Sequence, residues 1–525
     1  MGHAGSRQGL EDVRRRIESR IGRLSVTGRY HRLPRKLEDD YTVDSKVLGS
    51  GYSGVVLLAE DKSTHSKCAV KRFKLSSLSA SDRQEIATEC EILLSMDHPH
   101  IVRLVDVYET GTHLSLVMEC MDGGELFERI KTKKRFPENE AAQATSQMLL
   151  AINYIHRRGI VHRDVKLENF MYESKTSDHL KMIDFGFGKI CKPDTHMTDS
   201  LGTVAYCAPE VLTKKYTSQC DLWSLGVIVF ILLSGYMPFA GSDEAMVAAI
   251  TNRRYKMKKD RWAGVSQQAW TFTLSLLEVD PDKRLTAEQA LKHEWIQKHS
   301  NVQTKPEHIN ASIVDGLTNF ARLSAFRRAC MSVLAWGVTG NEDAKVREAF
   351  LQMDANQSGT ISMTEFKKAL QDMHVADDAI NKAFKALDIN RSHEIDYAEF
   401  LAAMVVVPSC IDLSHQTLHK TFRRFDTDSS GYITEANLQE VLGDKFDGQN
   451  VSKLICEADT SNDGAISFSE FMQYMGDVNT KWKVGQFSKD ALWSPSCSGS
   501  DSPTDESLVS ELSSPPTAPA CCCVQ

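Results

Sequence analysis

The chain has 525 residues, of which 42% are hydrophobic and 25% charged, and its net charge is −8. This composition is ordinary for a globular protein, and at about 150 residues per domain it predicts about three or four domains. It excludes collagen-like, wholly disordered and single-small-domain proteins. The 13 cysteines lack the even, close spacing of a disulfide framework, so we expect reduced thiols in the cytosol.

The formal charge is distributed unevenly along the chain. Residues 1–36 contain ten basic and three acidic residues, whereas residues 341–480 contain 24 acidic and 12 basic residues. A basic segment favours an anionic surface, and an acidic segment favours cations. The longest apolar run, near Leu225–Leu233, is much shorter than the ~20 residues of a membrane-spanning helix and predicts a buried helix instead.

Hydrophobic periodicity and turn signals divide the chain into five segments. Strand-like runs are expected over about 41–120 and helices over about 124–298. One face of a predicted helix in the basic arm carries Leu10, Val13, Ile17, Ile21 and Leu24. The segments are a basic arm at 1–40, a domain at 41–298, a junction at 301–340 with a helix from Gly316 to Trp336, an acidic domain at 341–480, and a tail at 481–525 whose Ser- and Pro-rich end should be disordered.

A glycine-rich turn and a lysine at the end of a strand suggest a site for nucleotide phosphates. Gly49, Gly51 and Gly54 allow the backbone to approach phosphates without a side chain in the way. Lys71 ends an apolar strand, where its charge can hold the α- and β-phosphates. A buried lysine needs a partner, and Glu89 on the following helical stretch is the natural one.

A second group of residues suits phosphoryl transfer. Asp164 can accept the proton of a substrate hydroxyl, and Asn169 can hold a metal ion. Lys166 would neutralise charge on the transferring phosphoryl group. Asp184, which follows an apolar strand, is suited to Mg²⁺ that bridges the nucleotide phosphates.

These motifs, with Glu210 and its predicted ion-pair partner Arg284, resemble those of the eukaryotic protein kinases over roughly residues 41–296. The resemblance implies a bilobal α+β fold with ATP between a small β lobe and a larger helical lobe. The Asp-x-Lys form of the catalytic loop resembles serine/threonine rather than tyrosine kinases. The resemblance also implies substrate contacts by Glu125 and Glu168, which would receive arginines upstream of the phosphoacceptor, and by Thr203. It implies nucleotide contacts by Leu48, Gly49, Gly51, Gly54, Val56, Ala69, Lys71, Met118, Glu119, Met121 and Glu125.

One position in the activation segment departs from what many kinases carry. Asp199 stands three residues before the Gly-Thr of this segment, where a phosphate often pairs with the arginine of the catalytic loop, here Arg163. A carboxylate can make the same charge-assisted contact permanently. We therefore expect an Asp199–Arg163 ion pair and a kinase that needs no phosphorylation there. The alternative is a solvated Asp199, with the switch on Thr195, Thr198 or Ser200.

Residues 341–480 contain four copies of the twelve-residue EF-hand loop, at 354–365, 388–399, 426–437 and 459–470. Oxygens at loop positions 1, 3, 5, 7, 9 and 12 wrap Ca²⁺. Isoleucine at position 8 of every loop predicts that the loops pair through a short β bridge. Position 9 offers Ser362, Asp396, Thr434 and Ser467. The other candidate ligands are Asp354, Asn356, Ser358, Thr360, Glu365, Asp388, Asn390, Ser392, Glu394, Glu399, Asp426, Asp428, Ser430, Tyr432, Asp459, Ser461, Asp463, Ala465 and Glu470.

Two of the loops depart from the EF-hand pattern. His393 in loop two occupies the position where glycine normally supplies a left-handed turn, which is a modest strain. Asn437 ends loop three and gives one neutral oxygen where glutamate gives two charged ones. We expect loops one and four to bind Ca²⁺ well, loop two to be intermediate, and loop three to bind weakly or not at all.

A kinase joined to four EF-hands resembles the calcium-dependent protein kinases of plants and protists, over about residues 41–476. The resemblance implies an all-α, calmodulin-like domain that controls the kinase in cis. The junction carries an apolar stripe over Leu317–Leu334 beside Arg322, Arg327 and Arg328, and a calcium sensor captures such helices. We expect this helix to inhibit the kinase without Ca²⁺; the alternative is a helix that only caps the large lobe.

Both ends of the chain carry lipidation patterns. Gly2, followed by Ser6, matches N-myristoylation, and Cys522 begins a C-terminal prenylation box. One myristoyl chain anchors only marginally, so a second signal is needed, which the basic arm or a prenyl group would supply. We therefore expect a cytoplasmic protein attached peripherally to the cytoplasmic face of a membrane.

The leading hypothesis is a Ca²⁺-activated serine/threonine protein kinase that uses ATP, Mg²⁺ and Ca²⁺. We expect protein substrates, a monomer and no nucleic-acid partner. The competing hypothesis is a calcium-sensing adaptor whose kinase lobes are only a scaffold. Intact Lys71, Asp164 and Asp184 argue against the adaptor.

Overall fold

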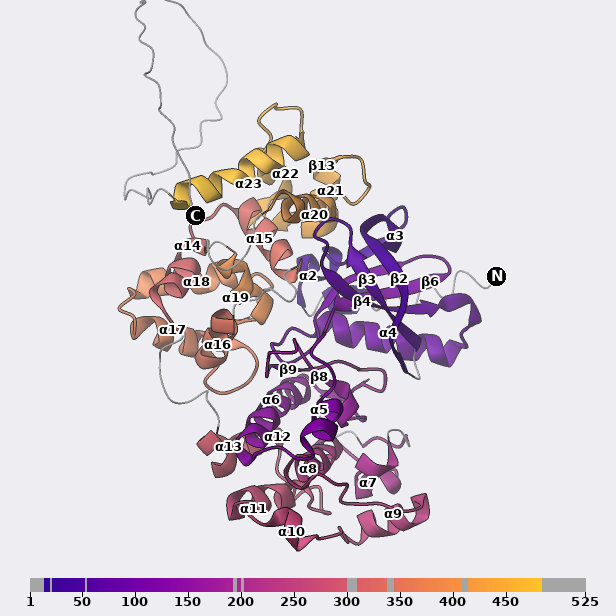
Figure 1. Cartoon of the computed structure of the whole chain (residues 1–525). Coiled ribbons are helices and arrows are strands. Elements are labelled where there is room, and N and C mark those ends of the chain that lie inside the picture. The colour runs from indigo at the N-terminus through magenta and orange to yellow at the C-terminus, as the bar shows by residue number, and fades with distance from the viewer. Residues whose placement is uncertain are drawn as a thin grey trace, which may run out of the picture. The chain divides into compact units, whose positions relative to one another are not determined.

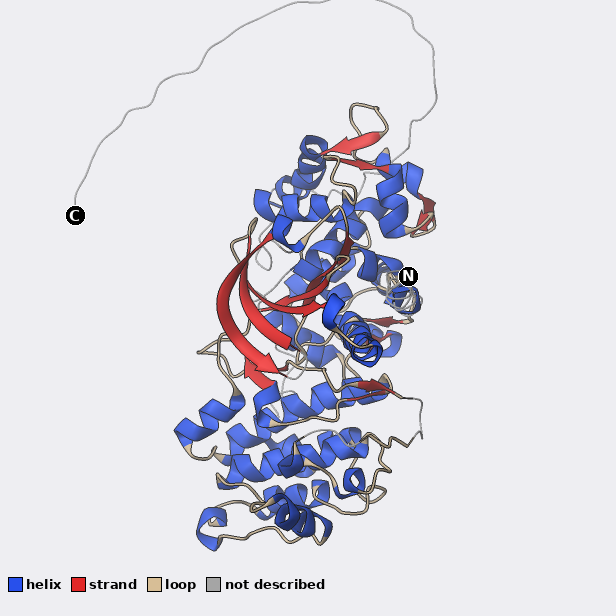
Figure 2. Cartoon of the chain, turned by 90° about the vertical axis from the view of Figure 1, so that its right-hand side faces the viewer, coloured by secondary structure: helices blue, strands red, loops and turns tan. Residues whose placement is uncertain are grey.

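The first part of the chain folds around a six-stranded sheet, the curved red layer in Figure 2. The strand order is β1-β5-β6-β4-β3-β2, and all neighbours are antiparallel except β1 and β5. The strands are β1 (Tyr30–Arg32), β2 (Tyr41–Gly51), β3 (Gly54–Asp61), β4 (Lys67–Lys74), β5 (Leu104–Glu109) and β6 (His113–Glu119). The computed structural model describes residues 14–18, 21–51, 54–191, 196–199, 203–299, 309–337, 344–405, 407 and 414–483.

Helix α4 (Ala80–Ser95) is the long helix of this small lobe. A reciprocal capping box begins it, because the Ser79 hydroxyl accepts from the Asp82 N–H and the Asp82 carboxylate accepts from the Ser79 N–H. Its apolar side chains Ile86, Cys90 and Leu93 are buried in the core. This burial fixes the side of the helix that carries Glu89 toward the interior.

Helices are the main regular structure of residues 126–299, as expected for the large lobe. Helix α8 (Gln219–Ser234) contains the apolar run Leu225–Leu233, whose side chains are at most 5% exposed, so the prediction of a buried helix is confirmed. The other helices are α5 (Leu126–Lys133), α6 (Glu138–Arg157), α7 (Pro209–Leu212), α9 (Asp243–Thr251), α10 (Lys259–Trp262), α11 (Gln267–Leu276), α12 (Ala287–Leu291) and α13 (Glu294–His299). Two-stranded pairs join β7 (Ile160–Val161) to β10 (Lys189–Ile190) and β8 (Phe170–Tyr172) to β9 (Leu180–Met182).

The acidic segment forms a helical domain, which we call the sensor, labelled α16 to α23 in Figure 1. Its loops pair as predicted: Ile361 lies opposite Ile395, and Ile433 lies opposite Ile466. The helices are α16 (Ala344–Met353), α17 (Met363–Gln371), α18 (Asp377–Leu387), α19 (Tyr397–Met404), α20 (His415–Phe425), α21 (Glu435–Leu442), α22 (Val451–Ile455) and α23 (Phe468–Lys483). The strands are β11 (Ile361–Ser362), β12 (Glu394–Ile395), β13 (Tyr432–Thr434), β14 (Lys445–Phe446), β15 (Gln449–Asn450) and β16 (Ala465–Ser467).

The junction contains two helices, α14 (Ala311–Phe320) and α15 (Ala325–Gly337), where the sequence predicted one. Helix α14 packs on α18 and α19, and α15 packs on α19, α20 and α22. The chain turns between the two helices because these surfaces lie on different parts of the sensor. Two successive turns connect the helices. The Arg322 N–H donates to the Asn319 carbonyl, and the Leu323 N–H donates to the Phe320 carbonyl.

The basic arm is joined to the small lobe by backbone pairing, because strand β1 extends the small-lobe sheet next to β5. The predicted continuous helix through Leu24 is wrong, because Gly22, with φ of 86°, separates α2 (Arg23–Thr27) from the helical residues 14–18. Arg29 and Arg35 are buried, so these two cations are not available to an anionic surface.

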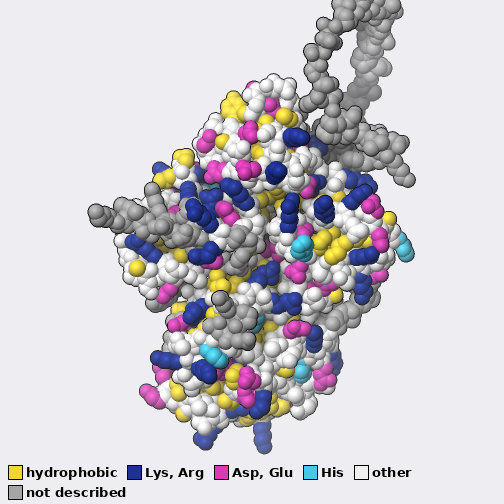
Figure 3. All heavy atoms as spheres, turned by 180° about the vertical axis from the view of Figure 1, so that it is seen from behind, with side chains coloured by type: hydrophobic (Ala, Val, Ile, Leu, Met, Phe, Trp, Pro, Cys, Tyr) yellow, Lys and Arg dark blue, Asp and Glu magenta, His cyan; other side chains and the backbone are white. Residues whose placement is uncertain are grey.

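The exposed surface carries charges of both signs. Lys/Arg and Asp/Glu side chains are interspersed on the face that Figure 3 shows. Among the helices of the described residues, none is long and apolar enough to cross a membrane. The predicted lipidation sites Gly2 and Cys522 lie outside the described residues.

Candidate functional site

The predicted Lys71–Glu89 pair is present between β4 and α4. Lys71 Nζ lies 2.5 Å from Glu89 Oε1 and 3.5 Å from Asp184 Oδ1. Burial alone would lower the pKa of Lys71, but the carboxylates of Glu89 and Asp184 outweigh it and hold this pKa above its ordinary value. The lysine therefore remains an ammonium beside Asp184, the candidate metal ligand.

Asp184 is held in place by the backbone of its own motif. Its Oδ1 accepts a 3.0 Å hydrogen bond from the Gly186 N–H. Burial opposes ionisation of this carboxyl, yet Lys71 and the Gly186 N–H outweigh burial and lower the pKa of Asp184. The side chain is thus an anion suited to a hard divalent cation.

Asp164 lies within a group of donors that are close together only in the folded chain. Its carboxylate accepts from Lys166 Nζ at 2.5 Å, from Thr203 Oγ1 at 3.3 Å and from Asn169 Nδ2 at 3.4 Å. Asn169 also donates to the Asp164 carbonyl at 2.8 Å. The structure therefore brings together two of the predicted catalytic residues, one candidate metal ligand and the predicted substrate contact Thr203.

The backbone of the catalytic loop is fixed by a residue whose role sequence reasoning missed. The buried Asp221 carboxylate accepts 2.9 Å hydrogen bonds from the N–H groups of His162 and Arg163, and a 2.8 Å contact from His156. Arg163 has a φ of 68°, which these bonds help to sustain in a non-glycine residue. An Asp at the start of a buried helix was the available signal.

The predicted ion pairs of the activation segment are present. Asp199 Oδ2 lies 2.8 Å from Arg163 Nη1 and 2.9 Å from Lys189 Nζ. The hydrogen bond from Lys189, together with Arg163, lowers the pKa of Asp199. Arg284 contacts both carboxylate oxygens of Glu210, at 2.6 and 3.0 Å. Thr198 is described beside this cluster, whereas Thr195 and Ser200 lie outside the described residues.

The candidate nucleotide residues lie on adjoining strands of the sheet. Val56 pairs with Lys71, and Ala69 pairs with Met118. Gly49 pairs with Val56, Gly51 pairs with Gly54, Leu48 is 42% exposed, and Met121 follows β6. Lys71 lies inside β4 (Lys67–Lys74) and not at the end of a strand as predicted, and these residues lie on or next to the strands around it.

The Glu119 side chain is engaged by other residues of the kinase domain. Both its oxygens accept 2.8 Å contacts from Lys181 Nζ, and Oε1 accepts from the Arg103 N–H at 2.7 Å. This buried ion pair joins β6 to β9. A carboxylate with all these partners is not free to bind a nucleotide, so only the Glu119 backbone remains a candidate.

Glu125 and Glu168, the candidate receptors for a basic substrate residue, are close enough to influence each other. Burial and then the Glu168 carboxylate raise the pKa of Glu125. Two neighbouring carboxylates repel, and a substrate arginine would relieve that repulsion.

The EF-hand loops share one hydrogen-bond scheme, in which loop three has Asn437 in place of the final glutamate. The first aspartate accepts from the N–H groups at positions 5 and 6, as Asp354 does from Ser358 at 2.8 Å and Gly359 at 2.7 Å. The final glutamate accepts from position 3 and position 9, as Glu365 does from Asn356 at 2.9 Å and Ser362 at 3.0 Å. The equivalent bonds in other loops are made by Asp388, Glu399, Asp426, Asp459 and Glu470.

This donor set fits Ca²⁺, because it gathers carboxylate, amide, hydroxyl and carbonyl oxygens around each loop. Burial raises the pKa of Asp354 to about 7. A bound cation would compensate the charge of such a buried carboxylate. The residues present are therefore suited to hold Ca²⁺.

The departures in loops two and three have different consequences: the first keeps the backbone turn of the loop, and the second changes an atom at a ligand position. His393 has a φ of 67°, so it adopts the left-handed turn that glycine usually supplies, as predicted. In loop three Asn437 Oδ1 accepts from the Thr434 N–H at 2.9 Å, but Nδ2 donates to Thr427 Oγ1 at 3.0 Å. The atom that replaces the second glutamate oxygen is a donor, which cannot bind a cation.

The junction helices are held by the sensor through their predicted apolar stripe. The ring of Phe326 lies 5.7 Å from that of Phe425 and 5.6 Å from that of Tyr474. Arg327 donates to the Tyr474 carbonyl at 2.7 Å, and Arg328 pairs with Asp447. Arg322 is exposed and donates to Asn319 at 3.1 Å.

Comparison with known proteins gives matches over most of the chain. A protein kinase domain matches residues 42–296, and an EF-hand domain pair matches residues 343–405 and 416–476. Calcium-dependent protein kinase 7 of Arabidopsis thaliana is 34% identical over 458 residues, which is 84% of each chain. Calcium-dependent protein kinase 3 of Plasmodium berghei is 34% identical over 464 residues, 86% of this chain and 82% of the relative. Calcium-dependent protein kinase 3 of Oryza sativa subsp. japonica is 33% identical over 456 residues, 85% of this chain and 82% of the relative.

Proposed function

The chain belongs to the calcium-dependent protein kinase family, and from that membership we propose how its residues transfer phosphate and answer to Ca²⁺. It is a Ca²⁺-activated serine/threonine protein kinase that uses ATP and Mg²⁺. The kinase assignment depends above all on one observation: the Lys71–Glu89 pair at 2.5 Å stands beside Asp184, as phosphoryl transfer requires.

In the proposed mechanism each polar residue has one task. Lys71 holds the α- and β-phosphates, and Asp184 and Asn169 hold Mg²⁺, which neutralises charge on the phosphates when bound. Asp164 orients the substrate hydroxyl and accepts its proton. Lys166, 2.5 Å from Asp164, stabilises the negative charge that the transferring group carries.

The substrates we propose carry basic residues upstream of the acceptor. Glu125 and Glu168 support this preference, because their mutual repulsion favours binding of a cation between them. A peptide series in which single arginines are replaced by glutamine tests it. The variants Glu125→Gln and Glu168→Gln should lose the preference for arginine, with a raised KM and little change in kcat.

For regulation we propose that the junction inhibits the kinase without Ca²⁺ and is held by the sensor with it. The contacts of Phe326, Arg327 and Arg328 with the sensor support the second half of this cycle. Sensor EF-hands expose an apolar groove when they bind Ca²⁺. We further propose that loop three contributes least, because the Asn437 amide nitrogen donates instead of binding a cation.

For location we propose a monomer attached to the cytoplasmic face of a membrane through lipid on Gly2 and a second signal, either basic arm residues or a prenyl group on Cys522. Exposed Arg15 supports a contribution from the arm, whereas buried Arg29 and Arg35 contribute nothing. Flotation with anionic lipid vesicles, comparing lipidated wild type with Gly2→Ala, tests this proposal.

One experiment tests the central proposal against the adaptor alternative. The whole chain is assayed for γ-phosphate transfer to an arginine-containing peptide, with Ca²⁺ and with a chelator. We expect transfer with Ca²⁺ and little transfer with the chelator. Binding of Ca²⁺ without transfer in either condition would favour the adaptor.

A further inference from the structure

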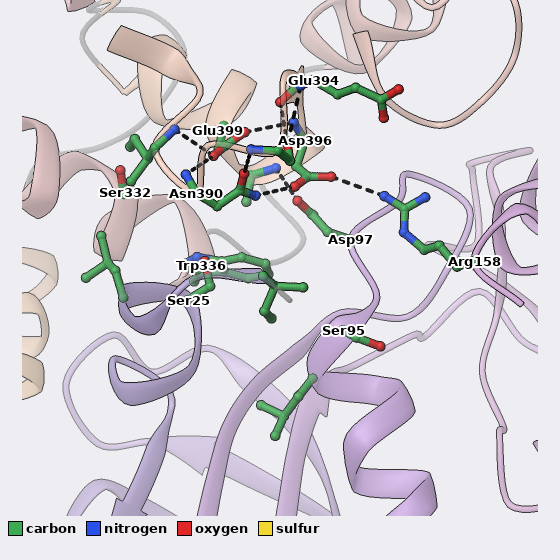
Figure 4. A pocket seen from close by; sticks show the side chains of 16 residues that line it. Ser25, Ser95, Asp97, Arg158, Ser332, Trp336, Asn390, Glu394, Asp396 and Glu399 are labelled. Carbon is green, nitrogen blue, oxygen red and sulfur yellow. Dashed lines mark hydrogen bonds and ion pairs between the residues drawn. The ribbon is translucent and has the colours of Figure 1, made fainter. Parts of the chain in front are cut away.

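Calcium loop two is in direct contact with the kinase domain. Figure 4 shows Arg158, directly after the end of α6, extending toward Asp396 at position 9 of the loop, and Nη2 of the arginine lies 3.2 Å from Oδ1 of the aspartate. The other Asp396 oxygen accepts a 2.7 Å hydrogen bond from the amide of Asn390, a candidate Ca²⁺ ligand. Donors therefore engage both oxygens of this carboxylate, and one donor is a cation of the kinase domain.

The surrounding packing holds Arg158 against the loop. The guanidinium carbon lies 3.7 Å from the centre of the Tyr154 ring. The Tyr154 hydroxyl accepts a 2.8 Å hydrogen bond from the Asp97 N–H. Oδ2 of Asp97 in turn accepts a 2.6 Å hydrogen bond from the N–H of Ala398, in the first turn of α19. Loop two cannot move away from Arg158 without breaking this bond.

The charged groups around the contact line one cavity of about 220 Å³. In Figure 4 the Asp97 and Asp396 carboxylates lie near each other in this cavity, with Arg158 approaching from the kinase side. Oδ1 of Asp97 is buried and has no hydrogen-bond partner among the described residues. The charged lining residues are Asp97, Arg158, Glu394, Asp396 and Glu399. Kinase residues of both signs thus lie beside the candidate Ca²⁺ ligands.

We propose that Arg158 and Ca²⁺ compete for Asp396, so that contact with the kinase domain sets the Ca²⁺ affinity of loop two. The inference rests on the proposed assignment of loop two as a Ca²⁺ site. A cation beside a ligand carboxylate repels Ca²⁺ and occupies an oxygen that would otherwise serve it. Because coupling is reciprocal, Ca²⁺ in loop two weakens the Arg158–Asp396 contact by the same factor. Asp97 acts in the opposite sense, since its negative charge favours Ca²⁺.

The test is a calorimetric Ca²⁺ titration of the full chain. Loop two is identified as the component that Glu399→Gln removes. Arg158→Gln, which keeps a hydrogen-bond donor but loses the charge, should tighten that component at least about fivefold. Arg158→Lys should leave it within about twofold of wild type. Arg157→Gln is the matched control, because it removes the same charge from the exposed neighbouring side chain and should change nothing.

A second variant separates charge from structural support. Asp97→Asn keeps an oxygen to accept from the Ala398 N–H but removes the negative charge, so it should weaken loop-two binding. If Arg158 and Asp97 only supported the loop, both variants would shift affinity in the same direction. Unchanged or weaker binding in Arg158→Gln overturns the competition. A titration that Glu399→Gln leaves unaltered overturns the assignment of loop two itself, and the competition with it.

Discussion

Asp164 shows how one side chain depends on its immediate neighbours. It is 5% exposed, and donors from Lys166, Asn169 and Thr203 lie around it. Because Lys166, Asn169 and Thr203 all act as donors here, the Asp164 carboxylate is the group of this cluster that can accept the proton of the substrate hydroxyl. The nucleotide is expected on the other side of Lys166, against Lys71 and Asp184.

The first prediction is therefore that Asp164→Asn abolishes transfer while ATP still binds. The amide keeps the shape of the side chain but cannot take up the proton, so we expect turnover to fall about 10²- to 10⁴-fold. Steady-state kinetics and a fluorescent-nucleotide titration measure the two effects. Turnover near that of wild type would contradict the assignment.

The second prediction concerns loop three of the sensor. Asn437→Glu replaces a neutral amide by a bidentate carboxylate and should tighten Ca²⁺ binding in this loop. Calorimetry of the whole chain measures it. Glu365→Gln and Glu470→Gln are the comparison, since each removes such a carboxylate and should raise the Ca²⁺ needed for activation. Unaltered Ca²⁺ binding after Asn437→Glu would mean that the residue at position 12 does not limit the Ca²⁺ affinity of loop three.

The third prediction is that the kinase acts without phosphate on its activation segment. Asp199 already pairs with Arg163 and Lys189, so phosphatase-treated enzyme with Ca²⁺ should be active from its first turnovers. Asp199→Ala should slow turnover, because Arg163 then loses its anion. Rapid-quench assays measure the first turnovers of treated wild type and of Asp199→Ala. A lag caused by autophosphorylation in treated wild type, or full activity of the variant, would count against this interpretation.

Among the elements, the segment before the kinase domain differs most from expectation. Strand β1 has only three residues, Tyr30–Arg32. The residues just before it contact the small lobe, the junction and the sensor. The Arg29 guanidinium lies over the Trp336 ring of α15 at 3.7 Å, and Thr27 donates to the Val441 carbonyl of α21 at 2.8 Å. The arm therefore connects the small lobe, the junction and the sensor.

The fourth prediction is that Arg29→Met destabilises the protein. Arg29 is fully buried and donates to the carbonyls of Ser25, Leu94 and Leu104. Methionine fills part of the space but leaves these acceptors unpaired, at a cost of about 3 kcal/mol. Urea unfolding followed by tryptophan fluorescence measures this, with exposed Arg15→Met as control. Equal stability of the two variants would show that the buried guanidinium is dispensable.

At the scale of the whole molecule, the junction has contacts on both sides. It packs against the sensor through Phe326, and the Ala335 carbonyl accepts from Arg103 of the small lobe at 3.2 Å. The position of the junction is therefore compatible with two roles. It could inhibit the kinase until the sensor withdraws it, or it could stabilise the kinase domain as a brace.

The fifth prediction distinguishes these roles. A chain truncated after Ser300 should be active in chelator, because it lacks the inhibitory helix. Circular dichroism and thermal melting establish that it is folded, and peptide phosphorylation with and without Ca²⁺ measures its activity. A folded but inactive truncated chain would show that the junction braces the kinase.

Sequence by itself determined the chemistry and the class of fold. The order and spacing of Lys71, Asp164 and Asp184 predicted a kinase, and four loops in register predicted a calcium sensor. These patterns are readable because phosphoryl transfer and Ca²⁺ coordination demand particular atoms at particular separations. The isoleucine pairing was predicted from position 8 of the loops, and the Lys71–Glu89 pair from the need of a buried lysine for an anion. Both are present.

Tertiary structure alone decided which charged residues face solvent and which surfaces meet. Arg29 and Arg15 belong to one basic run, yet one is buried and the other exposed. The Glu119 side chain is paired with Lys181, and Arg158 meets Asp396, 238 residues away. Such contacts leave no periodic or spaced signal, because they depend on the packing of elements that are distant in the chain.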